Sequence, residues 1–181
     1  SQLLFRSDGQ VANTIVHELT HGTIFVKDSL QLNENIASLI GDEGATAFLA
    51  HKHGAESSEV KQYQYYLQDR AKYTNHMLRG TNQLDSLYQS FPEDLTMEVK
   101  RNEKEKLIRE IVATTDTLNL KTSQYQKVKN RIKSRKEPPN NTFFKSYVRY
   151  RKNLDDLKIE LDNQFDGDIA RYLAYLKEKY D

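Results

Sequence analysis

The stretch VANTIVHELTHGTIFVKDSLQLNENIASLIGDEGA, residues 11–45, places two histidines four positions apart, with a glutamate directly after the first. His17 and His21 fall on one face of a helix about one turn apart, where two imidazole nitrogens can meet one metal ion. Glu18 lies about 100° further around that helix, where it can contact a metal-bound water without being a ligand. The stretch therefore predicts a metal site carried by a helix.

The third metal ligand must come from outside that helix, because a catalytic zinc ion takes three protein ligands and keeps one position open. Two histidines and one glutamate form a standard ligand set, and Glu34, thirteen residues after His21, is the natural candidate. The chain has no cysteine, so nitrogen and oxygen must hold the metal, and we expect Zn²⁺ as the cofactor. The alternative is that both histidines are packed core residues or capped surface residues.

Local signals predict two helices in this first part of the chain. Ser7 and Gln10 form a capping-box pattern ahead of an apolar stripe, which predicts a first helix from about Asp8 to Phe25. A short connection leads to a second helix that begins near Asn33 and ends around residues 51–58. Glycines concentrate in the first third of the chain, which favours long helices over most of the remainder.

The middle of the chain carries two long apolar stripes. Between Glu59 and Phe91 the apolar positions mostly recur every three or four residues, which predicts a long amphipathic helix. A second stripe follows between Leu107 and Ile132. Pro92 lies between the stripes and cannot donate a backbone hydrogen bond, so it favours a break. Two stripes joined by a short turn predict an antiparallel helical hairpin, and the fold class is mainly α.

We expect the chain to be organised in three segments within one domain. Residues 1–56 carry the metal-binding helices, residues 57–137 form the long helical hairpin, and residues 138–181 form carboxy-terminal helices that pack on the site. The last segment is expected to break near Gly167. The chain begins at Ser1, sixteen residues before the histidine motif, and we expect it to be a segment of a longer protein.

Composition narrows the classes of partner. The 27 Lys and Arg residues balance 26 Asp and Glu residues, and a net charge of +1 provides no general attraction to nucleic acid or anionic membrane, so no nucleic-acid partner is expected. No apolar run approaches the roughly 18 residues of a transmembrane helix. The basic cluster at residues 127–136 is expected to complement a helix dipole and to solvate the surface. The histidines of HKH, residues 51–53, do not share a helical face and are expected to end a helix.

The motif stretch also resembles a known family. Residues 13–45 are similar to the predicted bacterial zinc aminopeptidase family, whose members carry an HExxH helix, a short valine-lysine turn, an Asn-Glu motif and a glycine. More broadly, the stretch resembles the gluzincins, the thermolysin-like zincin metallopeptidases, whose third ligand typically lies further along the chain than Glu34. The strong resemblance covers about residues 10–50, with a weaker one at PNNTFFKSYVRY, residues 139–150. It implies a fold that is the carboxy-terminal helical half of a zincin-like metallopeptidase.

The resemblance implies a mechanism as well. Glu18 would take the proton of the attacking water and later protonate the leaving amine. Gluzincins use a tyrosine or histidine to stabilise the charge on the carbonyl oxygen, and Tyr150 is the first candidate here, with Tyr147 as the second. Each of the 11 tyrosines can instead be an ordinary packing or surface residue.

An aminopeptidase also needs acceptors for the free amine of its substrate, for which Asn140, Asn141 and Glu43 are the candidates. The chain departs from the thermolysin-like pattern at Ser38, where those enzymes have an aspartate that orients a histidine. Asp42 or Glu43 could take over that supporting role. The sheet that ordinarily precedes the HExxH helix cannot fit in sixteen residues, so we expect much of the substrate cleft to be missing.

The leading hypothesis is a zinc-dependent metallopeptidase, aminopeptidase-like, that hydrolyses a peptide or protein substrate. A second hypothesis is a non-catalytic helical module that binds a protein partner on the hairpin, with a structural metal or none. A third is hydrolysis of a substrate other than a peptide. Glu18 favours an enzyme, because a purely structural metal site needs no carboxylate beside an open coordination position. The resemblance to bacterial envelope proteins implies the cell envelope or periplasm, with the cytoplasm left open.

Overall fold

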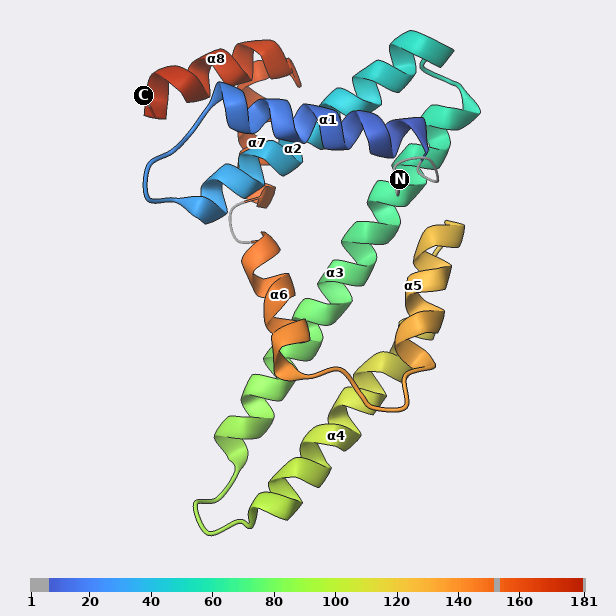
Figure 1. The fold of residues 1–181 in the computed structure, drawn as a ribbon, viewed down its shortest axis with the longest axis vertical. Coiled ribbons are helices and arrows are strands. Elements are labelled where there is room, and N and C mark those ends of the chain that lie inside the picture. Colours follow the sequence, from blue (N-terminus) through green and yellow to red (C-terminus); the bar gives the residue numbers. More distant parts are fainter. Residues whose placement is uncertain (1–6, 152–153, 181) are drawn as a thin grey trace. The chain divides into compact units, whose positions relative to one another are not determined.

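The computed structural model describes residues 7–151 and 154–180, and it describes the side chains of residues 7–148 and 154–180. Its described part consists of α-helices and one 3-10 helix and contains no strand, which confirms the expected mainly α fold (Figure 1). Among the described residues, no helix combines the length and the apolar character that a membrane span requires.

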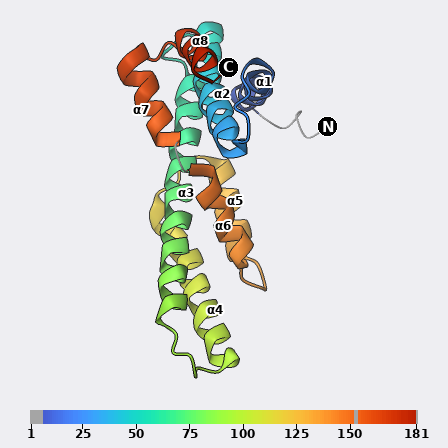
Figure 2. The same cartoon turned by 90° about the vertical axis from the view of Figure 1, so that its left-hand side faces the viewer.

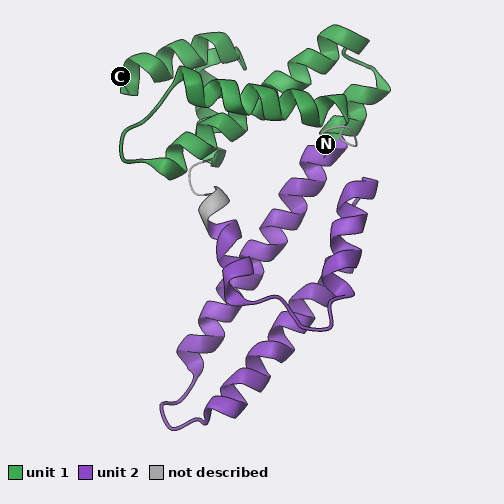
Figure 3. Cartoon of the chain, viewed as in Figure 1, with its two compact units in different colours: residues 1–64, 149–181 green, residues 65–148 purple. Residues whose placement is uncertain are grey.

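The chain divides into two compact units (Figure 3). Unit 1 comprises residues 1–64 and 149–181, and unit 2 comprises residues 65–148. The long helix α3 (Ser58–Ser90) contributes its first residues to unit 1 and the remainder to unit 2. The carboxy-terminal segment after residue 137 is likewise divided between the two units.

Unit 1 is built around two neighbouring helices at the start of the chain. Besides the beginning of α3, its helices are α1 (Asp8–Thr23), α2 (Leu30–His53), α7 (Leu154–Phe165) and α8 (Ile169–Tyr180). The helices α7 and α8 contact α2 and each other (Figure 2). The core between them contains the buried apolar residues Ile24, Ile36, Leu39, Ile40, Leu157, Leu161, Tyr172 and Leu176. The histidine motif lies on α1, where this helix faces α2.

The helix α1 begins as its sequence predicts. The Ser7 hydroxyl accepts a hydrogen bond from the Gln10 backbone N–H at 3.4 Å, and the Gln10 side chain accepts one from the Ser7 backbone N–H at 3.2 Å. The helix ends at Thr23, two residues before the expected end at Phe25, because Ile24 adopts an extended backbone and enters the core. The β-branched and aromatic residues at this point favour an extended chain over another helical turn. The next helix, α2, begins at Leu30, earlier than expected.

Unit 2 contains α3 and α4 (Met97–Ala113) as antiparallel neighbours. Gly80 allows their close approach, because a Cβ atom there would lie 2.7 Å from Cγ2 of Ile111. Nearby, Nε2 of His76 lies 2.8 Å from the carbonyl oxygen of Ile111, which gives this histidine a structural contact. The core of the unit contains the buried apolar residues Tyr73, Met77, Leu84, Ile108, Ile111, Val112, Leu120, Ile132 and Phe144.

The second long stripe is not one helix. After α4 the chain passes through a 3-10 helix, η2 (Thr114–Leu118), and then begins α5 (Ser123–Lys133). The hydroxyls of Thr114, Thr115 and Thr117 donate to backbone carbonyls three or four residues earlier, and such bonds compete with the regular helix pattern. Asn119 then takes a left-handed backbone conformation with φ of 47°. The apolar spacing continues through this region although the helix does not.

One buried carboxylate in unit 2 determines where α5 begins. Asp69 on α3 is fully buried and accepts hydrogen bonds from the backbone N–H groups of Lys121 and Thr122 and from the Thr122 hydroxyl, at 2.7–3.0 Å. These N–H groups lie at the amino-terminal end of α5, where a negative charge is stabilised by the helix dipole. The remaining helix, α6 (Asn141–Arg151), follows after a connection that contains two prolines.

Candidate metal centre

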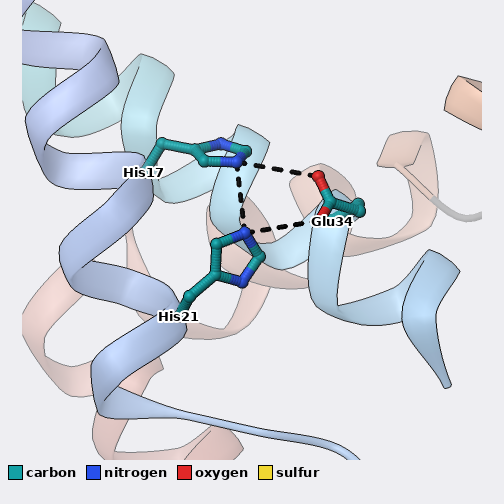
Figure 4. A group of neighbouring side chains, drawn as sticks. All are labelled: His17, His21 and Glu34. Atoms are coloured by element: carbon teal, nitrogen blue, oxygen red, sulfur yellow. Dashed lines mark hydrogen bonds and ion pairs between the residues drawn. The ribbon is translucent and has the colours of Figure 1, made fainter. Parts of the chain in front are cut away.

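Three side chains of types that can ligate a metal ion converge in unit 1 (Figure 4). The Nε2 atoms of His17 and His21 lie 3.2 Å apart. The carboxylate of Glu34 faces both rings, with Oε2 at 3.7 Å from Nε2 of His17 and Oε1 at 3.4 Å from Nε2 of His21. Two consecutive turns of α1 therefore direct one nitrogen each, and the second turn of α2 directs both carboxylate oxygens of Glu34, toward one small region.

The spacing of these donors fits a tetrahedral zinc ion. Ligand atoms about 2.0–2.1 Å from zinc at tetrahedral angles lie roughly 3.3–3.4 Å from one another. The two Nε2 atoms lie 3.2 Å apart, and each has a different Glu34 oxygen near it, at 3.7 Å for His17 and 3.4 Å for His21. The side chains of His17, His21 and Glu34 are 22%, 30% and 47% exposed, so solvent reaches all three of them. A catalytic site needs an open fourth position.

Glu34 reaches the two histidines although few residues separate it from them, because the connection between α1 and α2 is short and is held by hydrogen bonds. Asn33 is buried, and its side chain makes two hydrogen bonds with the backbone of Val26. The Val26 N–H donates to Asn33 Oδ1 at 2.7 Å, and Asn33 Nδ2 donates to the Val26 carbonyl at 2.8 Å. These bonds tie the connection to the residue that directly precedes Glu34.

Glycines on α2 let α1 approach closely beside the histidines. A Cβ atom on Gly41 would lie 3.1 Å from both the backbone oxygen and Nδ2 of Asn13, and 3.4 Å from Cβ of His17. A Cβ atom on Gly44 would lie 2.9 Å from Cγ1 of Val16. The two helices therefore meet almost backbone to backbone over the turn that carries the first histidine.

A hydrogen bond between the helices lies at the same level. Nδ2 of Asn13 donates to Oδ1 of Asp42 at 2.8 Å, and the Asp42 residue is only 8% exposed. Because a buried carboxylate needs polar partners, this bond favours one relative position of the two helices. Asp42 was a candidate for supporting a histidine directly, and the bond to Asn13 instead acts one helical turn before His17.

Glu18, the expected general base, is exposed on α1 between the two histidines. Within the described residues, its carboxylate makes no hydrogen bond or ion pair. A carboxylate without a competing partner is available to accept a proton from a water molecule at the metal site.

The remaining candidates of unit 1 have other contacts. The carboxylate of Glu43 pairs with the Lys158 ammonium at 3.0 Å, which links α2 to α7. Ser38 is buried within α2. At the end of α2, Nε2 of His53 lies 3.7 Å from a carboxylate oxygen of Asp8, a weak ion-pair geometry at the surface.

The candidates from the weaker resemblance at residues 139–150 lie mostly in unit 2. The Asn140 side chain accepts a hydrogen bond from the Phe143 N–H at 3.1 Å, and Asn141 Oδ1 accepts one from the Tyr88 hydroxyl at 2.9 Å. Tyr147 is partly buried and packs against the core of unit 2. Tyr150, the first candidate for stabilising the carbonyl oxygen, lies outside the residues whose side chains the structure describes.

Unit 2 contains a pocket of about 170 Å³ that is lined in part by basic residues. Its cationic lining residues are Arg109, Lys133 and Arg135, and the buried Val112 and Ile132 also line it. Lys133 forms an ion pair with Asp116. Because these cations lie at or near the carboxy-terminal ends of α4 and α5, they complement the helix dipoles.

Asn13 and Gly41 have roles that the sequence pattern did not indicate. An asparagine one turn before a histidine and a glycine within an apolar stripe are both common in helices. Only the pairing of α1 with α2 gives these two residues their contacts with Asp42 and His17. The four-residue spacing of Asn13 and His17 was the one available signal, since it places both on the same face of α1.

Comparison with known proteins gives one result for the whole chain. No curated protein and no solved structure matches it. A family model described as "Putative aminopeptidase" matches residues 1–179 and thus includes the helices that carry His17, His21 and Glu34. Since the match extends over almost the entire sequence, the chain belongs to this aminopeptidase family.

Proposed function

We propose that this protein is a zinc-dependent metallopeptidase of the aminopeptidase type, in which His17, His21 and Glu34 hold the metal ion. The observation that carries the proposal is the convergence of two imidazole Nε2 atoms and one carboxylate at distances that suit tetrahedral zinc. Membership of an aminopeptidase family supports a peptide as the substrate. The HExxH pattern followed by an Asn-Glu pair supports a place among the gluzincins.

The residues of the chain have distinct roles in this reaction. A bound zinc ion would supply the Lewis acidity that activates water and polarises the scissile carbonyl group. His17 and His21 would hold it through imidazole nitrogens, and Glu34 would hold it through its carboxylate. Glu18 accepts the proton of the attacking water and delivers it to the amine that leaves. Because Glu18 is exposed, a substrate can approach it from solvent.

The proposal is tested by the zinc content of the untagged protein. We expect about one zinc per chain in the wild type and loss of zinc in His17→Ala, His21→Ala and Glu34→Ala. Glu178→Ala is the control for Glu34→Ala, because it removes an exposed carboxylate from α8 in the same unit. Zinc-free wild type after zinc has been supplied, or zinc that all three ligand variants retain, would overturn the proposal.

A further inference from the structure

The helices α1 and α2 approach each other closely at several residues along their length. The chain runs antiparallel in the two helices, so Gly9 lies near Leu49, Asn13 near Gly41, and His21 near Glu34. A Cβ atom on Gly41 would approach Asn13 and His17 at 3.1–3.4 Å, closer than side chains ordinarily pack. The helix that carries both histidines therefore lies so close to residue 41 that a side chain there would require α1 to shift by a few tenths of an ångström.

We propose that Gly41 and the hydrogen bond between Asn13 and Asp42 are positioning elements of the metal centre. Gly41 sets the distance between the axes of α1 and α2 at His17, and the Asn13–Asp42 bond sets the position of α1 along α2. None of these three residues contacts the metal in this assignment. The inference rests on the proposed metal centre and adds to it the residues that hold its ligands in place.

The helical geometry connects these residues to the ligands. Gly41 follows Glu34 by seven residues, about two turns, so both lie on the side of α2 that faces α1. Asn13 precedes His17 by one turn on the facing side of α1. A rigid helix transmits a displacement at Asn13 to His17 and His21, and metal donors must be held within roughly 0.5 Å of their productive positions.

Gly44 on the same helix is a second close approach. The three atoms nearest a Cβ on Gly44 all belong to the Val16 side chain, at 2.9, 3.3 and 3.5 Å. At Gly41, by contrast, one of the nearest atoms is the backbone oxygen of Asn13, which cannot move without moving α1. Gly22 has no atom within 4 Å of its Cβ position and serves as a control on α1 itself.

The experiment measures zinc affinity by competition with a chromophoric chelator, together with the visible absorption spectrum of the Co²⁺-loaded protein. We expect Gly41→Ala to bind zinc about tenfold more weakly than the wild type and to change the Co²⁺ spectrum, as residues that orient metal ligands do. Gly22→Ala is expected to keep the wild-type spectrum. Gly80→Ala, whose Cβ would lie 2.7 Å from Cγ2 of Ile111 in unit 2, controls for a general loss of stability and is also expected to keep the spectrum.

Asn13→Ala tests the same inference without adding an atom, so it covers the case in which Gly41→Ala does not fold. We expect it also to weaken zinc binding and to change the Co²⁺ spectrum. Wild-type affinity and spectrum in Asn13→Ala, or equal effects of Gly41→Ala and Gly80→Ala, would overturn the positioning role while His17→Ala still loses zinc. Failure of the wild type to bind zinc through His17, His21 and Glu34 would instead overturn the metal centre, and the positioning role with it.

Discussion

The side-chain amide of Asn33 pairs with both backbone groups of Val26, as donor at 2.8 Å and as acceptor at 2.7 Å. Val26 lies in the connection that leaves the histidine helix, and Asn33 directly precedes the third ligand candidate, Glu34. One buried amide thus replaces the backbone pairing that a regular element would provide, and it holds the connection against the turn of α2 that carries Glu34.

Asn33→Ala should lower both stability and zinc affinity. The substitution leaves the N–H and C=O groups of Val26 without these partners, which costs about 1–3 kcal/mol in the free energy of unfolding. Urea denaturation measures this loss, and chelator competition measures zinc binding. Asn102→Ala, at an exposed position of α4, is the control and should have little effect on either quantity. Unchanged urea denaturation in Asn33→Ala would contradict the anchoring role.

Glu18→Gln should separate catalysis from metal binding. Glutamine keeps the size of the side chain but cannot accept the proton, so we expect kcat to fall by about 10²–10⁴-fold while zinc content stays at the wild-type level. Hydrolysis of aminoacyl chromogenic substrates by the zinc-loaded protein measures the first quantity, and elemental analysis measures the second. Wild-type activity in Glu18→Gln would exclude Glu18 as the general base.

Asp69→Asn should destabilise unit 2. The asparagine amide would place its own N–H group among the N–H donors of Lys121 and Thr122, in a fully buried position. Because hydrogen bonds to a charged group contribute about 1.5–3 kcal/mol, we expect a loss of at least that size in the free energy of unfolding. Asp85→Asn makes the same exchange at an exposed position of α3 and should be nearly neutral. Comparable urea midpoints for the two variants would argue against the role of Asp69 in starting α5.

The stability of unit 1 should depend on Glu160 in a pH-dependent way. Burial acts to raise the pKa of Glu160, but hydrogen bonds from Tyr172 at 2.7 Å and Lys179 at 3.2 Å outweigh it and hold the pKa below the ordinary value of 4.5. A carboxyl group with a lowered pKa in the folded state stabilises the fold above its unfolded pKa, and this contribution disappears as the pH falls through the folded pKa.

The corresponding measurement compares thermal unfolding of the wild type and Glu160→Gln at pH 7 and at pH 3. We expect the wild type to be more stable at pH 7 and the difference to shrink at pH 3. Glu178→Gln, an exposed position on α8, is the control and should follow the wild type at both values. A difference that does not change with pH would show that Glu160 acts through packing alone.

Several features of the fold could be predicted from local sequence. The capping box of Ser7 and Gln10 indicated the start of α1, and the apolar periodicity after Glu59 indicated α3. Local patterns failed where the chain turns away from a regular helix. Ile24 leaves α1 for the core, and the threonines after Ala113 interrupt the second stripe. In both places the end of the regular helix depends on contacts with residues distant in sequence. The periodicity of apolar residues carries no information about such contacts.

By itself, the sequence determined that the chain is helical and that His17, Glu18 and His21 share one helix. Once a helix forms, residues four apart lie on the same face of it. Only the tertiary structure decided how Glu34 meets the histidines and which residues hold it there. The contacts of Gly41 with Asn13 and His17 and of Asn33 with Val26 depend on how two helices approach each other. Such contacts are set by packing in three dimensions, and no spacing along a single helix encodes them.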